Sequence, residues 1–381
     1  MTRILGIESS CDETAAAVVR DGIHVASNII ASQHDLHAEY AGVVPEVASR
    51  AHLERIEAVV RESLRAADTE LPAIDAIAVG NRPGLIGSLL VGTSAAKALA
   101  WSLEKPLIGI DHVQAHLYAA FMAYCGRERV DLETMTSADI LSRRGAALRE
   151  LFPALGLVVS GGHTNLYSLT GPTDLDRLGK TRDDAVGEAY DKAAVILGLG
   201  YPGGPNVDRA AGKGNPGHCR LPRSLLGPDS LDFSFSGLKT ALLYRVRGNP
   251  QGHGEAARYA RCADDLEETE RLNLAASFQE AAVDVVIEKL DRAHRAMASP
   301  PRSLLVGGGV SANRLLRQRC LEMEKAWNLN VCLPPLPLCV DNAAMIAGLA
   351  FEHHRLGQSD GLELCAFASS KETNPSRAFP T

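Results

Sequence analysis

Two histidines, His112 and His116, stand four residues apart in the chain. In a helix this spacing puts both imidazoles on one face, where they can reach a single metal ion. The same spacing also occurs at the exposed start of an amphipathic helix, so a metal site needs a third ligand. Asp341 is a candidate, because Asp111-His112 and Asp341-Asn342 open the last predicted helix of each half of the chain. Its alternative role is that of a helix N-cap. Together the three side chains would form a His, His, Asp set with open coordination positions, which suits zinc or ferrous iron.

Three familiar motifs match this sequence poorly. A zinc protease of the H-E-x-x-H type needs a glutamate as general base, and Val113 occupies that place. Gly198-Leu-Gly-Tyr-Pro-Gly203 matches G-x-G-x-x-G, but it follows a predicted helix and has Pro202 where a helix should begin. Gly179-Lys180-Thr181 resembles the end of a phosphate-binding loop, yet Asp174 stands where that loop needs glycine. Neither a metalloprotease nor these two nucleotide motifs are indicated.

Two glycine turns suggest anion and nucleotide binding. Ser160-Gly161-Gly162 interrupts an apolar strand, and its backbone N–H groups could close on an anion with the hydroxyls of Ser160 and Thr164 as further donors. An ordinary two-residue hairpin turn is the alternative. After another buried strand, Gly307-Gly308-Gly309 would let a flat ligand lie on the backbone, with Asn313 bonding it at the helix start. A tight strand-to-helix turn is the alternative there.

Acidic residues surround the irregular stretch Tyr201-Pro-Gly-Gly-Pro205. Asp191 and Asp208 flank it, and either could hold the hydroxyls of a ribose. On the first turn of the chain, Asp12 is a candidate for proton transfer or for orienting a bound molecule. The alternative for Asp12 is a turn-forming side chain that bonds its own backbone.

Composition restricts the class of protein. A chain of 381 residues exceeds what one hydrophobic core usually serves, which favours two domains. The net charge of -7 gives no overall attraction to nucleic acid or anionic membrane. Eight cysteines without a C-x-x-C pair indicate reduced thiols and a cytoplasmic protein. No secretory signal is expected, and the longest uncharged stretch, 151–173, contains too many Pro and Gly for a membrane helix.

Periodicity predicts an α/β protein with an internal duplication. Both halves follow the order βββ-α-β-α-β-α, and the strand, glycine turn and helix of 77–98 recur at 304–318. Two such domains should face each other across a cleft lined by turns from both. The expected strands cover 4–7, 15–20, 24–30, 76–80, 107–110, 155–159, 165–169, 175–178, 303–306 and 331–333. The expected helices cover 46–67, 86–103, 113–124, 187–197, 271–297, 313–327 and 342–354, with an irregular region at 198–231.

Taken together, several motifs closely resemble those of the TsaD family of tRNA threonylcarbamoyladenosine transferases, formerly called the glycoprotease or O-sialoglycoprotein endopeptidase family. The resemblance covers about 3–349 and rests on Gly6-Ile-Glu-Ser-Ser-Cys-Asp-Glu-Thr14, the His112/His116 pair, Val159-Ser-Gly-Gly-His-Thr164, Asp191-Lys192, Tyr201-Pro-Gly-Gly204, Gly307-Gly-Gly-Val-Ser-Ala-Asn313 and Asp341-Asn-Ala-Ala-Met-Ile346. It implies two duplicated actin-like ATPase domains (the ASKHA, ribonuclease H-like fold) around a central cleft.

The resemblance also implies an activity and partners. The family transfers the threonylcarbamoyl group of threonylcarbamoyl-AMP to N6 of the adenosine 3′ of the anticodon in tRNA. It implies bound Fe(2+), with Zn(2+) possible, and ATP or threonylcarbamoyl-AMP as the nucleotide ligand. A TsaB-like paralogue and a TsaE-like ATPase are the implied protein partners, and a separate synthase supplies the adenylate. By the same resemblance the metal ligands are His112, His116 and Asp341, and the substrate and nucleotide contacts are Val158, Val159, Ser160, Gly161, Gly162, Asp191, Gly204, Asp208 and Asn313.

The expected domains are a first lobe at 1–126, an insert or boundary at 127–150, a second lobe at 151–360 with an irregular insert at about 212–261, and a tail at 361–381. Three features depart from the family pattern: the turn Asn81-Arg82-Pro83-Gly84 is less Gly-rich, 127–150 looks like an insertion, and the segment before Phe233 is long. A sugar or acetate kinase of the same fold, which has no use for the two-histidine site, is one alternative function. A chaperone-like or actin-like nucleotide switch is the other.

A basic segment is the candidate tRNA contact. Lys213 to Arg261 holds eight Lys and Arg against three acids. Such a segment could steer a phosphate backbone towards the cleft, with Arg220, Arg223 and Arg247 as test positions. The alternative is a solvated insert that balances the acidic run Asp264 to Glu270 beside it.

Overall fold

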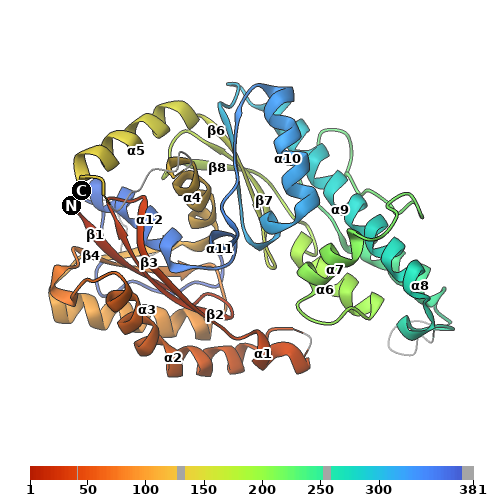
Figure 1. The fold of residues 1–381 in the computed structure, drawn as a ribbon, viewed down its shortest axis with the longest axis horizontal. Helices are drawn as coiled ribbons and strands as arrows, with labels where there is room; N and C mark the ends of the chain where they lie inside the picture. The colour runs from red at the N-terminus through yellow and green to blue at the C-terminus, as the bar shows by residue number, and fades with distance from the viewer. Residues whose placement is uncertain (41, 127–133, 252–258, 371–381) are drawn as a thin grey trace.

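The structure, a computed structural model, describes residues 1–40, 42–126, 134–251 and 259–370. Its strands form two five-stranded sheets (Figure 1). Sheet A contains β1 (Arg3–Glu8), β2 (Glu13–Arg20), β3 (His24–Ser32), β4 (Ala76–Arg82) and β5 (Leu107–Asp111). Sheet B contains β6 (Ala154–Val159), β7 (Thr164–Leu169), β8 (Leu175–Lys180), β9 (Ser303–Gly307) and β10 (Asn330–Cys332).

The two sheets share one topology. Sheet A has the order β3-β2-β1-β4-β5, and sheet B has the equivalent order β8-β7-β6-β9-β10. In each sheet the first three strands pair antiparallel, and the fourth and fifth join in parallel. Asp21 and Gly22, both at positive φ, form the predicted tight turn between β2 and β3. The predicted duplication is therefore confirmed.

Helices connect these strands. Their bounds are α1 (His34–His37), α2 (Pro45–Ala66), α3 (Ile86–Leu103), α4 (His112–Cys125), α5 (Ser137–Leu151), α6 (Val186–Leu197), α7 (Gly203–Ala211), α8 (Ser236–Arg247), α9 (Glu268–Ala296), α10 (Arg314–Trp327), α11 (Leu336–Cys339) and α12 (Ala343–Arg355).

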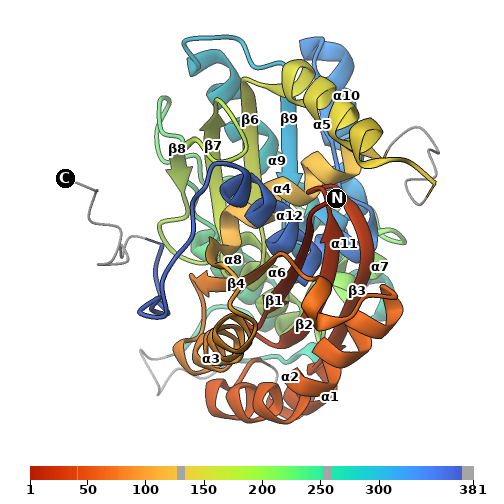
Figure 2. The ribbon, with the colours of Figure 1, turned by 90° about the vertical axis from the view of Figure 1, so that its left-hand side faces the viewer.

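The elements stack in layers with three buried cores. Helices α2 and α3 pack on the outer face of sheet A, and Figures 1 and 2 show them together on that side of the molecule. Helices α4 and α12 lie against each other between the sheets. Helix α12 follows sheet B in sequence but packs on β1 and β2, whereas α4 follows sheet A and packs on β9. Each half of the chain thus contributes one helix that packs on the sheet of the other half. The expected lobe boundaries follow the order of the chain and do not include this exchange.

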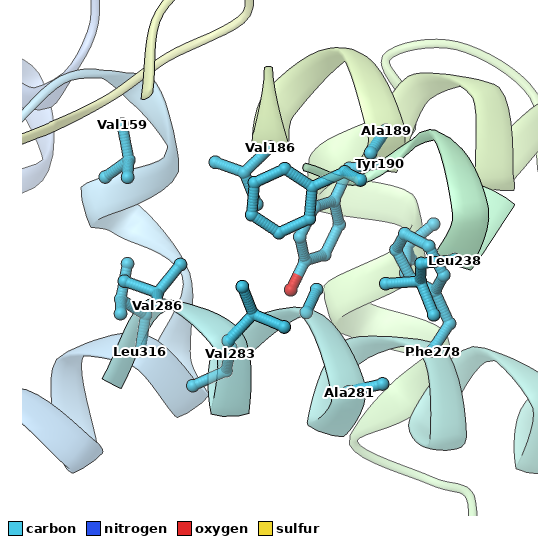
Figure 3. Packing of buried hydrophobic residues seen from close by; sticks show 14 of the residues in the cluster. Val159, Val186, Ala189, Tyr190, Leu238, Phe278, Ala281, Val283, Val286 and Leu316 are labelled. Atoms are coloured by element: carbon cyan, nitrogen blue, oxygen red, sulfur yellow. The ribbon is translucent and has the colours of Figure 1, made fainter. Parts of the chain in front are cut away.

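The third core lies between sheet B and helices α6 to α10. Figure 3 shows part of it, with Tyr190 of α6 and Phe278 of α9 among the buried side chains. Their rings meet edge to face at 5.2 Å. This apolar layer fixes α6 and α9 on the sheet, and thereby holds the loops between them in place.

Two helices lie in regions that the sequence predicts to be irregular. Helix α7 begins directly after Pro202, so the expectation that this proline blocks a helix start is wrong, although the motif does follow helix α6. Helix α8 lies inside the expected irregular insert at 212–261. Its first N–H groups are satisfied from far away, because Asp183 accepts hydrogen bonds from Phe235 N (2.9 Å) and Ser236 N (3.3 Å). No pattern in the residues around α8 predicts a cap from so distant a residue.

The expected insert at 127–150 contains helix α5, while 127–133 lie outside the described residues, as do 252–258 and the end of the expected tail from 371. Among the described helices, α3 alone is long and apolar enough to cross a membrane by length and composition, and a third of that window is buried. In this fold α3 packs on β4 and α2.

Candidate metal centre and nucleotide cleft

Helices α4 and α12 bring the three predicted metal ligands together. His112 and His116 lie on the first turns of α4, and Asp341 lies just before α12. The Nε2 atoms of the two histidines are 3.1 Å apart, and Asp341 Oδ1 is 3.3 Å from His112 Nε2 and 3.2 Å from His116 Nε2. The imidazoles are buried, whereas Asp341 is partly exposed. Asp341 is therefore the ligand that solvent reaches most easily.

Glu8 and Ser10 orient His112 from behind. Glu8 Oε2 is 3.0 Å from His112 Nδ1, and Ser10 Oγ is 3.2 Å from the same nitrogen. A proton held on Nδ1 by the carboxylate leaves Nε2 with its lone pair towards Asp341, as a metal ligand requires. Sequence reasoning missed Glu8, although a buried charge that ends an apolar strand signals a role of this kind.

The charges at this site are strongly coupled. Burial alone would lower the pKa of His112, but the carboxylates of Asp341 and Glu8 raise it well above its usual range. Burial would raise the pKa of Asp341, but His112 and His116 hold it well below its usual range. Burial lowers the pKa of His116. Next to the site, burial and the charges of His112 and His116 lower the pKa of His163 to about 4. His163 is thus neutral at physiological pH.

The donor set fits a small divalent metal ion. Two ligands held at about 2.0–2.1 Å from one ion are roughly 3.0–3.4 Å apart at octahedral or tetrahedral angles. The three observed separations, 3.1, 3.2 and 3.3 Å, fall within that range. Two imidazole nitrogens and one carboxylate oxygen suit zinc or ferrous iron equally well, so the geometry does not choose between them.

The Ser160-Gly161-Gly162 hairpin closes the cleft on the side of sheet B. Gly161 and Gly162 are exposed, and a Cβ at either would meet open space, which leaves room for a ligand on their backbone. Ser160 Oγ accepts from His163 N at 3.1 Å, and Thr164 Oγ1 accepts from Val186 N at 2.8 Å. The Thr164 hydroxyl oxygen thus accepts at the start of helix α6, and the expectation that this hydroxyl donates to an anion stays a prediction. Val158 and Val159 are fully buried in β6, so only their backbone can face a ligand.

Three consecutive glycines, the last residue of β9 and the two that follow it, have three different tasks. A Cβ at Gly307 would lie 2.3 Å from the carbonyl oxygen of His116, so this glycine lets β9 approach α4. Gly308 has φ +92°, and its Cβ would lie 2.4 Å from the carbonyl oxygen of Val159. Only Gly309 faces open space. The expectation that a flat ligand lies on all three glycines is therefore corrected to Gly309.

Asp191 shapes the second wall of the cleft. Its Oδ1 accepts from the N–H groups of Gly203 (3.1 Å) and Gly204 (3.3 Å), the first residues of helix α7. Burial raises the pKa of Asp191, and the charge of Asp12 raises it further. The two hydrogen bonds act in the opposite direction but do not cancel this effect. The space beside Gly204 is open. Asp191 thus caps α7, and Gly204 presents backbone to the cleft.

Asp208 and Asn313 meet at the edge of a pocket of about 260 Å³. Asn313 caps helix α10, and its Nδ2 lies 3.2 Å from Asp208 Oδ1 and 2.8 Å from Gln279 Oε1. Asp208 also accepts from Arg314 Nε at 2.8 Å. The pocket is lined by Asp208, Ala211, Gly212, Pro216, Ala276, Gln279, Glu280, Arg314, Leu315 and Gln318. Sequence reasoning missed Gln279 and Glu280, which sit in the middle of the apolar pattern of α9.

Asp12 lies on the first turn and faces the second half of the molecule. It is 7% exposed, and burial followed by the charge of Asp12 raises the pKa of Tyr201, while that charge adds to burial in raising the pKa of Asp191. The neighbouring Glu13 feels the charge of Asp341. Asp12 is therefore near the metal centre and near the start of α7, but no hydrogen bond joins it to a metal ligand among the contacts of the described residues.

The basic segment is only partly available to tRNA. Arg223 is held by Asp284, with Nη2 2.7 Å from Oδ2, and donates to the carbonyl of Leu221. The guanidinium of Arg247 lies 5.8 Å from the centre of the Tyr259 ring. Of the three test positions, Arg220 is exposed. The use of Arg223 as a free phosphate contact is therefore corrected, and Arg258 lies outside the described residues.

Two mixed sheets of equal topology, with helices exchanged between them around a polar cleft, define a duplicated actin-like α/β fold of the kind found in ATPases and sugar kinases. Among solved structures, HypF of T. kodakarensis superposes with a TM-score of 0.56 at 15% identity, over 93% of this chain and 48% of that one. This likeness concerns the fold alone.

Sequence comparison identifies the family. The model of the family described as "TsaD: tRNA N6-adenosine threonylcarbamoyltransferase" matches residues 24–130 and 131–348. A protein of that name from Thermomicrobium roseum is 48% identical over 373 residues, 95% of this chain and 94% of the relative. Another, from Syntrophomonas wolfei, is 45% identical over 366 residues, 96% of each. The chain belongs to the TsaD family.

Proposed function

We propose that this protein is a tRNA N6-adenosine threonylcarbamoyltransferase, which transfers the threonylcarbamoyl group of threonylcarbamoyl-AMP to N6 of the adenosine 3′ of the anticodon. Membership of the TsaD family supports the reaction. The observation that carries it in the structure is the convergence of His112, His116 and Asp341 from two separate helices at the open end of the cleft. A sugar kinase or a nucleotide switch of this fold would have no use for that cluster.

The reaction defines what the site must do. The N6 amine forms a bond to the carbamoyl carbon, the bond from that carbon to the phosphate oxygen breaks, AMP leaves, and the amine loses a proton. An ion held by His112, His116 and Asp341, iron or zinc, would supply Lewis acidity towards the carbonyl or phosphate oxygens. The backbone of Gly161 and Gly162 is exposed, with open space beside both residues, and could donate to the same oxygens.

Asp12 is the side chain that we assign to the amine. We infer that Asp12 lies near an entering adenosine base, because its charge acts on Asp191 and the charge of Asp341 acts on the neighbouring Glu13. Its carboxylate can accept the proton that the amine loses, or hold the amine by a hydrogen bond. His163 is neutral at physiological pH, but a pKa lowered to about 4 makes it a weak base, so it competes poorly for this proton.

The pocket beside Asp208 suits the adenosine of the adenylate. Gln279 and Glu280 line it with amide and carboxylate groups, which can bond the edge of a base, and Asp208 can bond ribose hydroxyls. Gly309 and Gly204 have open space beside their backbone, which lets the phosphate approach. We propose that these groups line one path from this pocket to the metal centre.

We also propose a cytoplasmic location and three protein partners: a TsaB-like paralogue, a TsaE-like ATPase, and a separate synthase that supplies the adenylate. Helix α3 offers a surface for one of the first two, since Ile86, Leu90 and Trp101 are 49%, 52% and 71% exposed. Leu53 of α2 is 70% exposed beside them. Such exposed apolar side chains are typical of a protein contact.

Nucleoside analysis tests the transfer directly. The purified protein, the proposed partners, unmodified tRNA and threonylcarbamoyl-AMP are incubated, and the tRNA is digested and examined by mass spectrometry. The wild-type protein should form the threonylcarbamoylated adenosine, and His112→Ala should form almost none. A wild-type protein that binds metal and nucleotide but modifies no tRNA with either partner present would refute the transferase assignment.

The tRNA contact is proposed at the exposed part of the basic segment. Lys213, Arg220 and Arg245 are exposed and belong to it. Reversing all three charges should weaken tRNA binding and flatten its dependence on salt, because fewer counterions are released. Adenylate affinity should stay unchanged. The matched control reverses three exposed cations elsewhere, Arg295, Lys325 and Arg355. Equal tRNA affinity and salt slope in both triple variants would rule out this surface.

A further inference from the structure

A second cluster of metal-ligand side chains lies beside the first. It consists of Asp12 and Glu13 at the start of β2 and His34 at the start of α1. Their ligand atoms all lie within 4.8 Å of one another. His34 Nε2 is 3.4 Å from Glu13 Oε1 and 4.0 Å from Asp12 Oδ2. None of these residues belongs to the centre formed by α4 and α12.

The spacing suits one ion. Ligands on a shared divalent ion are about 3 Å apart when they are adjacent, and about 4.2 Å apart when they lie on opposite sides. Both distances from His34 lie between these limits. The cluster therefore needs little rearrangement to hold an ion, unlike acidic groups scattered over a surface.

The charges around Glu13 call for a cation. Asp12 and Glu13 are each only 7% exposed. Burial, followed by the charges of Asp12, Asp341 and Glu8, raises the pKa of Glu13 well above its usual range. All the charged groups that act on Glu13 here are carboxylates. Adjacent buried carboxylates must share a proton or bind a cation.

The fold also positions the imidazole. The backbone N–H of Gln33 donates to the carbonyl of Asp12 at 3.1 Å, which ties the start of α1 to the first turn. The ring of His34 meets the ring of Tyr201 edge to face, with centres 5.9 Å apart. Tyr201 precedes helix α7, so the cluster lies where the two halves of the molecule meet, next to Asp191.

We propose that Asp12, Glu13 and His34 form a second divalent-cation site. One nitrogen and two oxygen ligands suit Mn²⁺ or Mg²⁺ more than the ion of the first centre, which has two imidazoles. Three protein ligands leave positions on a six-coordinate ion for oxygens of another molecule. If the proposed function holds, these positions face the phosphate of the adenylate, which otherwise approaches a group of carboxylates. Asp12 then serves the reaction by holding this ion and orienting the acceptor.

Counting Mn²⁺ tests the site without relying on transfer activity. Metal-free full-length protein is titrated with Mn²⁺, and free Mn²⁺ is followed by electron paramagnetic resonance. The wild type should bind two ions per chain. His34→Leu and His112→Ala should each bind one, and the double variant none. His218→Leu, which changes an exposed histidine in the segment after α7, is the matched control and should bind two.

His34→Leu should weaken the affinity for the second Mn²⁺ ion by at least about 100-fold. This is the upper end of the loss seen when a hydrogen-bond partner of a ligand is removed, and a ligand itself should matter more. If His34→Leu binds two ions with wild-type affinity, the proposal is wrong. It is also wrong if His112→Ala binds none. Glu13→Gln repeats the test from another ligand should the histidine variant fail to fold. If the wild type binds two ions but does not modify tRNA, the proposed function is wrong and the second cation site is not affected.

Discussion

Helices α4 and α12 occupy equivalent places in the duplicated fold, yet they present different ligands. Each follows the last strand of its sheet and begins near an aspartate followed by a polar residue. At α4, Asp111 is the cap, and its Oδ1 accepts from Val113 N at 2.9 Å and Gln114 N at 3.1 Å. At α12, Asn342 is the cap and accepts from Met345 N at 3.0 Å.

The cap thus differs by one position between the two helices, and this determines which side chain is free. At α4 the aspartate side chain accepts hydrogen bonds from the backbone, and the next residue, His112, faces the centre. At α12 the asparagine is consumed, which leaves the preceding Asp341 free. One repeated local pattern therefore supplies nitrogen ligands from one half and an oxygen ligand from the other.

The same two helices are joined a second time, away from the centre. Tyr118 of α4 donates to Glu352 Oε1 of α12 at 2.8 Å, and Arg144 of α5 donates to the same carboxylate, with Nε at 2.7 Å. All three side chains are buried. Helix α5 belongs to the segment that looked like an insertion, so this segment braces the pair of helices that carry the ligands.

Removing a ligand should have the largest effect. His112→Ala and Asp341→Ala should each fold, but their metal affinity should fall far below that of the wild type. The loss should exceed the roughly 10–100-fold that removing a hydrogen-bond partner of a ligand costs. Glu8→Gln, which changes only the orienting partner of His112, should fall within that smaller range. Elemental analysis and competition with a chelator measure both. Wild-type metal content in the two ligand variants would contradict the assignment.

Breaking the brace should have the next largest effect. Arg144→Ala leaves the buried Glu352 carboxylate with one fewer partner, and should lower the free energy of unfolding by about 3–5 kcal/mol. The double variant Arg144→Met, Glu352→Leu removes both charges and should recover most of that loss. Urea denaturation of metal-free protein measures it. A loss below about 1 kcal/mol for Arg144→Ala would show that the ion pair does not brace the helices.

A pair of glycine variants separates the fold from the ligand site. Gly308→Val should prevent folding, because φ is +92° and the added Cβ would contact the carbonyl of Val159. Gly309→Val should fold and keep its metal, yet bind AMP about 100-fold more weakly, because its side chain fills the space open to a ligand. Calorimetry with AMP measures the affinity. Unchanged affinity in folded Gly309→Val would place the nucleotide elsewhere.

Much of this architecture follows from the sequence. Strand β6 is apolar throughout, β1 is apolar between Arg3 and Glu8, and α2 and α9 have clear helical spacing. Comparing the two halves also predicted Asp341 as the third ligand, which neither helix start indicates alone. These features depend on local patterns and on repetition, and both are visible in the sequence.

The remainder depends on contacts between distant residues. Helices α7 and α8 start at positions capped by Asp191 and Asp183, and nothing within either segment marks these caps. The separate tasks of Gly307, Gly308 and Gly309 are decided by the chains that pack against them. The second cluster needs His34 from another element. Tertiary neighbours, rather than residue types, determine these features.

The smallest expected effect tests the comparison itself. Asp111→Ala and Asn342→Ala each remove one helix cap, and each should lower the free energy of unfolding by about 1 kcal/mol. Asp111→Asn and Asn342→Asp should be nearly neutral, because Asp and Asn are equally good caps. All four variants should keep their metal, since neither residue is a ligand. Urea denaturation and metal analysis of the same preparations provide both readouts. If Asp111→Ala lost metal while Asp111→Asn kept it, the cap would also position His112. If Asn342→Ala left the free energy of unfolding unchanged, Asp341 would be able to cap the helix in its place. The one-residue difference between the two helices would then not be the reason that Asp341 is free to bind metal.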